Sequence, residues 1–133
     1  MSDQPSAGKL LVVDDESYIL NVVSLKLRNA GYEVHTADDG EEAYELALQL
    51  IPDLVITDFQ MPFMTGLELC RKLKEHPETS HIPALMLTAM GFNVDTTELT
   101  RTNIAGLLSK PFSPRAVLDK VGELITAGAK RAG

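Results

Sequence analysis

The sequence predicts an α/β fold, (βα)5, in which a doubly wound sheet of five parallel strands lies between two layers of helices. Five apolar runs are too short for helices and indicate buried strands. Segments with the periodicity of amphipathic helices separate these runs. Because parallel strands need helical crossovers and are covered on both faces, we expect a three-layer sandwich with strand order 2-1-3-4-5.

The first half of the chain contains two predicted strands and two predicted helices. Alternating polarity places the second strand at an edge of the sheet. Asp39 followed by Glu42 resembles a capping box at the start of the second helix, and Pro52 ends that helix. In chain order, the elements are a strand over Lys9 to Val13, a helix over Ser17 to Asn29, a strand over Glu33 to Ala37 and a helix from Asp39 to Leu50.

The second half adds three strands and three helices. Thr65 and Glu68 form a second capping box, and Ser113-Pro114 is an N-cap followed by proline at the first helical position. The fourth helix is expected to be short and weak, because it carries four threonines. The elements are a strand ending at Asp58, a helix from Thr65 that ends before Pro77, a strand over Pro83 to Thr88, a helix over Asn93 to Asn103, a strand over Gly106 to Ser109 and a helix from Ser113 to Ile125.

Length, charge and cysteine content limit the classes of protein to consider. The 133 residues suit one domain, with a flexible lead-in at 1–8, a folded domain at 9–127 and a small-residue tail at 128–133. The net charge of −7 disfavours direct binding to nucleic acid or to an anionic membrane. The single cysteine, Cys70, excludes an internal disulfide, and no segment has the apolar length of a signal peptide or membrane span. We therefore expect a cytoplasmic protein.

Polar side chains follow four of the predicted strands and should meet at the carboxyl edge of the sheet, where open parallel sheets bind ligands. They are Asp14, Asp15, Asp58, Thr88 and Lys110. Two unit charges about 4 Å apart repel by about 4 kcal/mol at an effective dielectric constant of about 20, so the crowded carboxylates need compensation. Lys110 and a divalent cation would supply it, and all-oxygen ligation suits Mg²⁺.

Four motifs at these strand ends resemble those of response regulator receiver domains, the CheY-like family of two-component signalling. Each motif alone is weak evidence for the family, but all four in this order are specific to it. The resemblance covers roughly Lys9 to Ile125. The motifs are Leu11-Val12-Val13-Asp14-Asp15-Glu16, Asp58-Phe59-Gln60-Met61-Pro62-Phe63-Met64-Thr65-Gly66, Leu87-Thr88-Ala89 and Ser109-Lys110-Pro111-Phe112. The resemblance implies a flavodoxin-like sandwich and a role in a phosphorelay.

The resemblance also implies a role for each acidic residue. Asp58 would accept a phosphoryl group from the phosphohistidine of a histidine kinase or phosphotransfer protein. Asp15 and Asp58 would ligate Mg²⁺ together with the backbone carbonyl of Gln60, and Asp14 would hold a metal-bound water or assist directly. A nucleophile in line, a metal ion and a cation are the parts that phosphoryl transfer requires.

Signalling is implied in the same way. Thr88 would donate its hydroxyl to one phosphoryl oxygen, and Lys110 would pair with another. The new charge would then repack a switch region that includes Ala89 and Leu107, and change binding to a downstream protein or an output domain. The family usually has Tyr or Phe at the position of Leu107, which leaves open whether Leu rotamers and the threonine-rich helix replace that aromatic switch.

Smaller expectations concern residues near the motifs. Gln60 and Met90 would border the path of attacking water, and the resemblance suggests a cis bond between Lys110 and Pro111. Glu16 is expected to stabilise the first turn of the following helix, and Cys70 is expected to pack in a core.

Three other functions stay open on the residues alone. An aspartyl-phosphate hydrolase would share the nucleophile and Mg²⁺, but such enzymes usually need a second Asp where this chain has Gln60. A flavin-binding electron carrier needs a Ser-, Thr- or Gly-rich phosphate loop after the first strand, whereas the acidic run at 14–16 would repel phosphate. The intact acidic set argues against a scaffold that is never phosphorylated.

Overall fold

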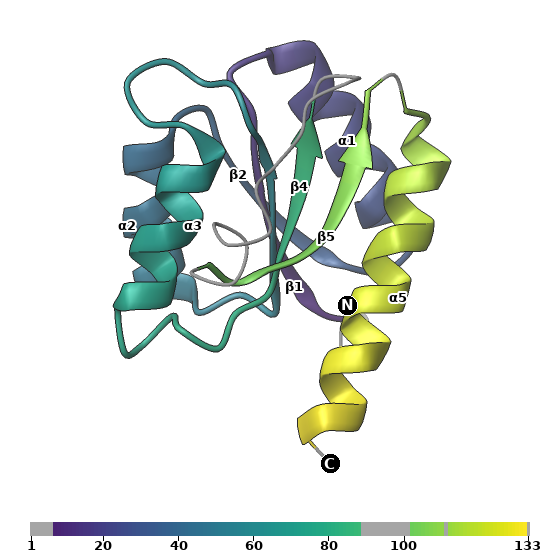
Figure 1. The fold of residues 1–133 in the computed structure, drawn as a ribbon. Helices are drawn as coiled ribbons and strands as arrows, with labels where there is room; N and C mark the ends of the chain where they lie inside the picture. The colour runs from purple at the N-terminus through teal and green to yellow at the C-terminus, as the bar shows by residue number, and fades with distance from the viewer. Residues whose placement is uncertain (1–6, 89–101, 111, 133) are drawn as a thin grey trace.

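The computed structural model describes residues 7–88, 102–110 and 112–132, and it shows one sheet between two layers of helices (Figure 1). The elements are β1 (Lys9–Val13), α1 (Ser17–Asn29), β2 (Glu33–Ala37), α2 (Gly40–Leu50), β3 (Leu54–Asp58), α3 (Gly66–Glu75), β4 (Ala84–Thr88), β5 (Ile104–Ser109) and α5 (Pro114–Ala132). The strand order is β2-β1-β3-β4-β5, and every neighbouring pair is parallel. The predicted fold class and strand order are therefore confirmed.

Two boundaries differ from the prediction. β5 begins at Ile104 rather than Gly106. α5 continues through Gly128 to Ala132, where the sequence predicts a small-residue tail, because Ala, Lys and Arg are strong helix formers and offset one glycine. The helix expected over Asn93 to Asn103 falls almost entirely outside the described residues.

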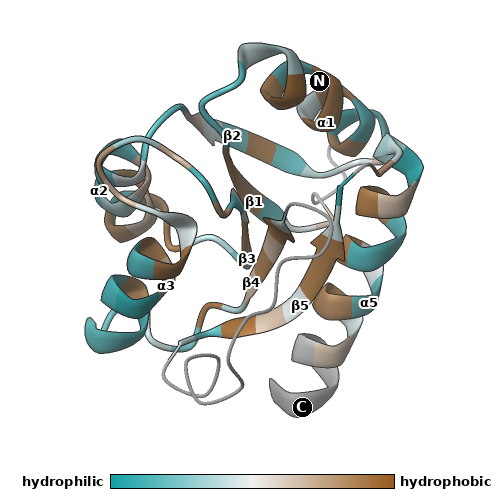
Figure 2. Ribbon diagram, turned by 45° about the horizontal axis from the view of Figure 1, so that its top comes forward, coloured by the Kyte–Doolittle hydropathy of each residue, from teal (hydrophilic) through white to brown (hydrophobic). Residues whose placement is uncertain are grey.

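Alternation along the central strands divides the apolar side chains between two cores. Leu10 and Val12 of β1 pack with α1 and α5, whereas Leu11 and Val13 pack with α2 and α3. Figure 2 shows the hydrophobic strands between helices whose outer faces are hydrophilic. All residues of β3 and β4 are buried, so the ends of these two strands are held by packing on both faces.

The helices are amphipathic, as predicted. α3 buries Leu69, Cys70 and Leu73 against the sheet, which confirms the packing role expected of Cys70. No helix in the described part of the chain combines the length and apolar content needed to cross a membrane.

The capping box predicted at the start of α3 is present. The Thr65 hydroxyl accepts a hydrogen bond from the Glu68 N–H at 3.1 Å, and the Glu68 carboxylate accepts one from the Thr65 N–H at 2.9 Å. These two bonds satisfy donors that the helix itself leaves without partners. They also fix the end of the loop that leads from β3 into α3.

Thr65→Ala should lower the free energy of unfolding by about 1 kcal/mol, because the Glu68 N–H loses its partner. Thr65→Ser keeps the hydroxyl and should retain most of the stability. Urea denaturation of the three proteins measures both effects. Equal stability of the Ala variant and the wild type would show that the Thr65 hydroxyl contributes nothing to the fold.

Candidate functional site

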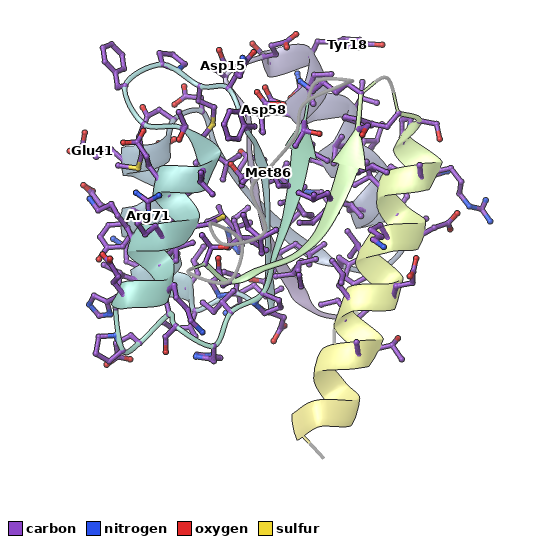
Figure 3. The ribbon with its side chains drawn as sticks, in the orientation of Figure 1. Asp15, Tyr18, Glu41, Asp58, Arg71 and Met86 are labelled. Carbon is purple, nitrogen blue, oxygen red and sulfur yellow. The ribbon has the colours of Figure 1, made fainter. Side chains whose placement is uncertain are left out.

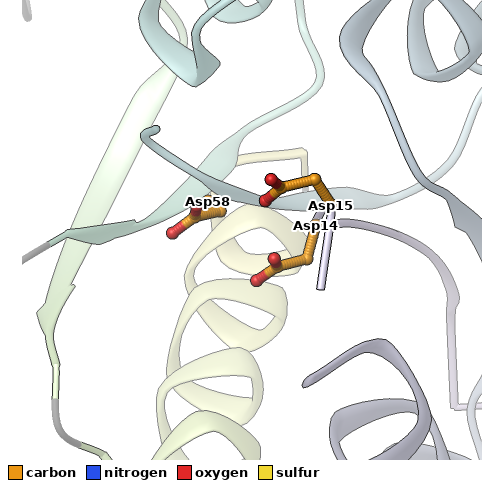
Figure 4. A group of neighbouring side chains, drawn as sticks. All are labelled: Asp14, Asp15 and Asp58. Carbon is orange, nitrogen blue, oxygen red and sulfur yellow. The ribbon is translucent and has the colours of Figure 1, made fainter. Parts of the chain in front are cut away.

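Three carboxylates meet at the carboxyl edge of the sheet (Figure 4). Asp14 and Asp15 follow β1, and Asp58 ends the neighbouring strand β3. One carboxylate oxygen of each residue lies within 4.8 Å of the others. Asp14 and Asp58 are buried and Asp15 is exposed, so the cluster opens to solvent on one side. The structure thus brings together the three acidic residues that the sequence places at this edge.

Asp14 is the most deeply buried member of the cluster. Its Oδ1 accepts a hydrogen bond from the Glu16 N–H at 2.9 Å, whereas its buried Oδ2 has no hydrogen-bond partner among the described residues. Burial, with a smaller contribution from the charge of Asp58, raises the pKa of Asp14 to about 6. The ionised form is therefore costly in the absence of a cation.

Lys110 reaches the cluster from the end of β5. Its Nζ lies 2.9 Å from Oδ1 of Asp58. Burial raises the pKa of Asp58, although the hydrogen bond from Lys110 opposes this shift. Burial disfavours the charge of Lys110 as well, but the hydrogen bond and the charge of Asp58 outweigh it and raise the lysine pKa. Each charge thus partly offsets the cost of burying the other.

Glu16 lies at the start of α1, next to the acidic cluster. It is the N-cap residue of α1, but its side chain makes no capping hydrogen bond. Its Oε1 instead lies 3.8 Å from Nζ of Lys110. The pair is partly exposed, so the contact is a weak ion pair at the edge of the cluster rather than a helix cap.

An open cleft of about 620 Å³ adjoins the cluster. It is lined by Asp15, Glu16, Asp58, Phe59, Gln60, Met61, Pro62, Thr65 and Lys110. Asp15 and Asp58 lie at the same end of the sheet in Figure 3. A ligand in solution can therefore reach the Asp58 carboxylate through this cleft, between the loops that follow β1 and β3.

The remaining predicted site residues lie outside the acidic cluster. Thr88 is buried at the end of β4, and its carbonyl accepts a hydrogen bond from the Lys110 N–H at 2.7 Å. It is not among the residues that line the cleft. Leu107 lies on the edge strand β5 and is 41% exposed. Ala89, Met90 and Pro111 lie outside the described residues.

The residues present fit a hard divalent cation. The described chain offers carboxylate oxygens from three residues, and the partnerless Oδ2 of Asp14 is an acceptor that a cation would satisfy. Exposed Asp15 leaves room for water ligands, which Mg²⁺ usually retains. The donor set therefore agrees with the Mg²⁺ site that the sequence predicts.

Gly66, to which the sequence pattern gives no site role, lies against the backbone of Asp58. A β-carbon on Gly66 would lie 2.2 Å from the Asp58 carbonyl oxygen. The Gly66 N–H donates a hydrogen bond to the Phe59 carbonyl at 2.8 Å. A glycine inside the first turn of a helix has no propensity advantage, so it is a signal of close backbone approach. That signal is readable in the sequence, although the contact it marks is not.

Comparison with known proteins identifies the family. The family model described as response regulator receiver domain matches residues 10–122. The transcriptional regulator RpaA of Synechocystis is 37% identical over 88% of this chain, and the transcriptional regulatory protein SrrA of Staphylococcus aureus is 35% identical over 90% of it. Each alignment covers 48% of the relative, so the chain spans about half the length of these two proteins.

Solved structures agree with this assignment. A response regulator of Chloroflexus aurantiacus superimposes with a TM-score of 0.82 at 35% identity, covering 92% of this chain and 99% of that one. The chemotaxis response regulator CheY4 of Vibrio cholerae gives a TM-score of 0.79 at 36% identity, covering 87% and 97%. The flavodoxin-like, CheY-like fold expected from the sequence is thereby confirmed.

Proposed function

Because the chain belongs to the response regulator receiver domain family, we propose that Asp58 accepts a phosphoryl group from a protein phosphohistidine in a Mg²⁺-dependent reaction. The resulting aspartyl phosphate changes the binding of a partner protein. The observation that carries the proposal is the Asp58 carboxylate at the end of a fully buried strand, 2.9 Å from the Lys110 ammonium and open to the cleft.

The transfer makes one bond and breaks another. An oxygen of the Asp58 carboxylate forms a bond to phosphorus while the bond from phosphorus to the imidazole nitrogen of the donor breaks, and the electron pair leaves with the imidazole. Lys110 holds Asp58 before the reaction and pairs with a phosphoryl oxygen as charge develops there. Thr88, at the end of the adjacent strand, is assigned a hydrogen bond to a second phosphoryl oxygen.

Asp15 and Asp58 would hold Mg²⁺, with the backbone carbonyl of Gln60 as a third protein ligand. Asp14 would contact the ion through a bound water or directly. Bound there, Mg²⁺ supplies the positive charge that the crowded carboxylates and a dianionic phosphoryl group both require. The partnerless oxygen of Asp14 supports this assignment, and so does the cleft position of Gln60.

The signal would pass from the phosphate to β5. The Lys110 N–H is hydrogen-bonded to the Thr88 carbonyl, so a shift of Thr88 toward the phosphate moves the end of β5 as well. Leu107 lies on this strand, partly exposed, and would present a different side-chain position to a partner. The family implies two classes of partner, a histidine kinase as the donor and a downstream protein as the target.

The hydrolase alternative gains no support from the site. Gln60 lines the cleft at the position where such an enzyme needs a carboxylic acid, and an amide cannot donate a proton to a leaving group.

Incubation with Mg²⁺ and acetyl phosphate, read by intact mass, tests the proposal. Wild type should gain one phosphoryl group, and chelation of Mg²⁺ should abolish the gain. Asp58→Ala should gain none, whereas Asp53→Ala, which removes an exposed carboxylate at the other end of β3, should be labelled like wild type. No gain by wild type, or equal gain by Asp58→Ala, would overturn the assignment of Asp58.

A further inference from the structure

The loop between β3 and α3 contains a strained turn with an aromatic residue at its centre. The Met64 N–H donates to the Pro62 carbonyl at 2.8 Å, which closes a three-residue γ-turn around Phe63. Phe63 has a φ of 70°, a conformation that is uncommon for any residue other than glycine and an outlier for a bulky one. Strain of this kind persists only where the surrounding structure enforces it, and it is concentrated at functional sites.

The residues on both sides of Phe63 hold the turn in place. Met61 is buried in the core between the sheet and α2 and α3, and the Met64 side chain lies against Gly40 at the start of α2. The Gly66 N–H donates a hydrogen bond to the Phe59 carbonyl, which closes the loop that contains Met61, Phe63 and Met64. These contacts hold the chain on both sides of Phe63.

Phe63 itself is fully exposed, with a relative exposure of 103%. No other large hydrophobic residue in the described part of the chain is as exposed. Pro62 before it and Thr65 two residues after it line the cleft beside Asp58, so the turn that carries Phe63 adjoins that cleft. In Figure 1, this loop rises beyond the end of the sheet, above α3. An exposed, preorganised aromatic side chain is the kind of residue that dominates protein–protein interfaces.

We propose that Phe63 is a hydrophobic anchor for the protein that carries the phosphohistidine, and that it has no part in the chemistry at Asp58. This inference rests on the proposed function. A protein donor brings its imidazole to Asp58 through the cleft, whose lining includes Gln60, Met61 and Pro62, so its surface passes beside the turn that carries Phe63. A small phosphodonor enters the cleft without touching Phe63.

The test compares a protein donor with a small donor. The protein probe is an autophosphorylated histidine kinase selected from a purified panel because it phosphorylates the wild-type chain, and the small probe is acetyl phosphate. Phe63→Asn removes the ring and suits positive φ, so transfer from the kinase should fall at least tenfold while labelling by acetyl phosphate stays within twofold. Phe63→Tyr keeps the ring and should restore most of the transfer.

A stability measurement accompanies the kinetics. Because Asn occurs at positive φ more often than Phe, Phe63→Asn should have a Tm no lower than that of wild type. Higher stability together with slower kinase transfer would show that Phe63 is retained for docking at the expense of the fold.

Several results would overturn the proposal. Unchanged transfer from the kinase would show that Phe63 makes no useful contact with it, and an equal fall with both donors would place Phe63 in the chemistry instead. Dimerisation of wild type that Phe63→Asn abolishes, with kinase transfer unchanged, would assign the ring to a contact between two copies. Failure of the proposed function is distinguishable, because wild type would then gain no acetyl phosphate label that depends on Asp58.

Discussion

Gly66→Ala is expected to lower the free energy of unfolding by about 1–3 kcal/mol, and to slow phosphorylation of Asp58 by acetyl phosphate at least tenfold. The added β-carbon would lie 2.2 Å from the carbonyl oxygen and 3.1 Å from the carbonyl carbon of Asp58. These are backbone atoms at the end of a strand buried on both faces, so they cannot move aside as a flexible side chain could. Relief must come from displacement of α3 or of the acceptor itself.

Gly122→Ala in α5 is the matched control. A β-carbon at Gly122 meets no atom within 4 Å apart from its chain neighbours and the backbone of its own helix, and alanine is the better helix former by about 1 kcal/mol. Urea denaturation should therefore show opposite signs for the two substitutions, and only Gly66→Ala should slow the labelling. A Gly66→Ala protein with wild-type stability and labelling rate would show that α3 does not constrain the position of Asp58.

Asp14→Asn is expected to stabilise the Mg²⁺-free protein at pH 7 while weakening Mg²⁺ binding at least tenfold. A pKa raised from 3.8 to about 6 means that ionised Asp14 costs the folded state about 3 kcal/mol. Asparagine carries no charge and can still accept the hydrogen bond from the Glu16 N–H. The same charge that destabilises the free protein is the one that a cation requires.

The pH dependence has a defined sign. The folded state holds the Asp14 proton more tightly than the unfolded state, so this group contributes stability below pH 3.8 that is lost as the pH rises through about 6. The shift at Asp58 acts in the same direction. The stability advantage of Asp14→Asn over wild type should therefore grow between pH 4 and pH 7 by up to about 3 kcal/mol.

Urea denaturation at several pH values, with and without Mg²⁺, measures these effects. Mg²⁺ at about 100 times its Kd should stabilise wild type by about 2.7 kcal/mol and Asp14→Asn by much less. Asp38→Asn removes an exposed carboxylate and should follow wild type throughout. A stability difference that does not vary with pH would contradict the raised pKa, and equal stabilisation by Mg²⁺ would exclude Asp14 from the metal site.

Most of the fold could be predicted because local signals agree with the tertiary structure. The runs that end at Val13, Asp58 and Thr88 are apolar on both faces, and only central strands of a covered parallel sheet need that pattern. The capping box at Thr65 and the prolines at positions 52 and 77 mark helix ends correctly, whereas Asp39 caps α2 without the reciprocal bond of a capping box, because the Glu42 carboxylate accepts from the Asp38 N–H. The sequence predicts too early an end for α5, because one glycine at position 128 weakens a helix without stopping it.

The acidic cluster could be predicted because parallel strands bring their carboxyl ends to one edge. The contacts that shape it could not, since they depend on distances between elements far apart in the chain. Gly66 against the Asp58 backbone, Glu16 near Lys110 and the exposed Phe63 are of this kind. A sequence pattern shows which side of an element is apolar, but it does not show which backbone approaches another to contact distance.

The central claim is that the phosphoryl group is carried by Asp58 and by neither of the other two carboxylates. Borohydride reduces an acyl phosphate to the alcohol, which converts a phosphorylated aspartate into homoserine. After labelling with acetyl phosphate and Mg²⁺, reduction and peptide mass spectrometry should find homoserine at position 58 alone. Homoserine at position 14 or 15, or none at 58 in protein that has gained a phosphoryl group, would contradict the claim.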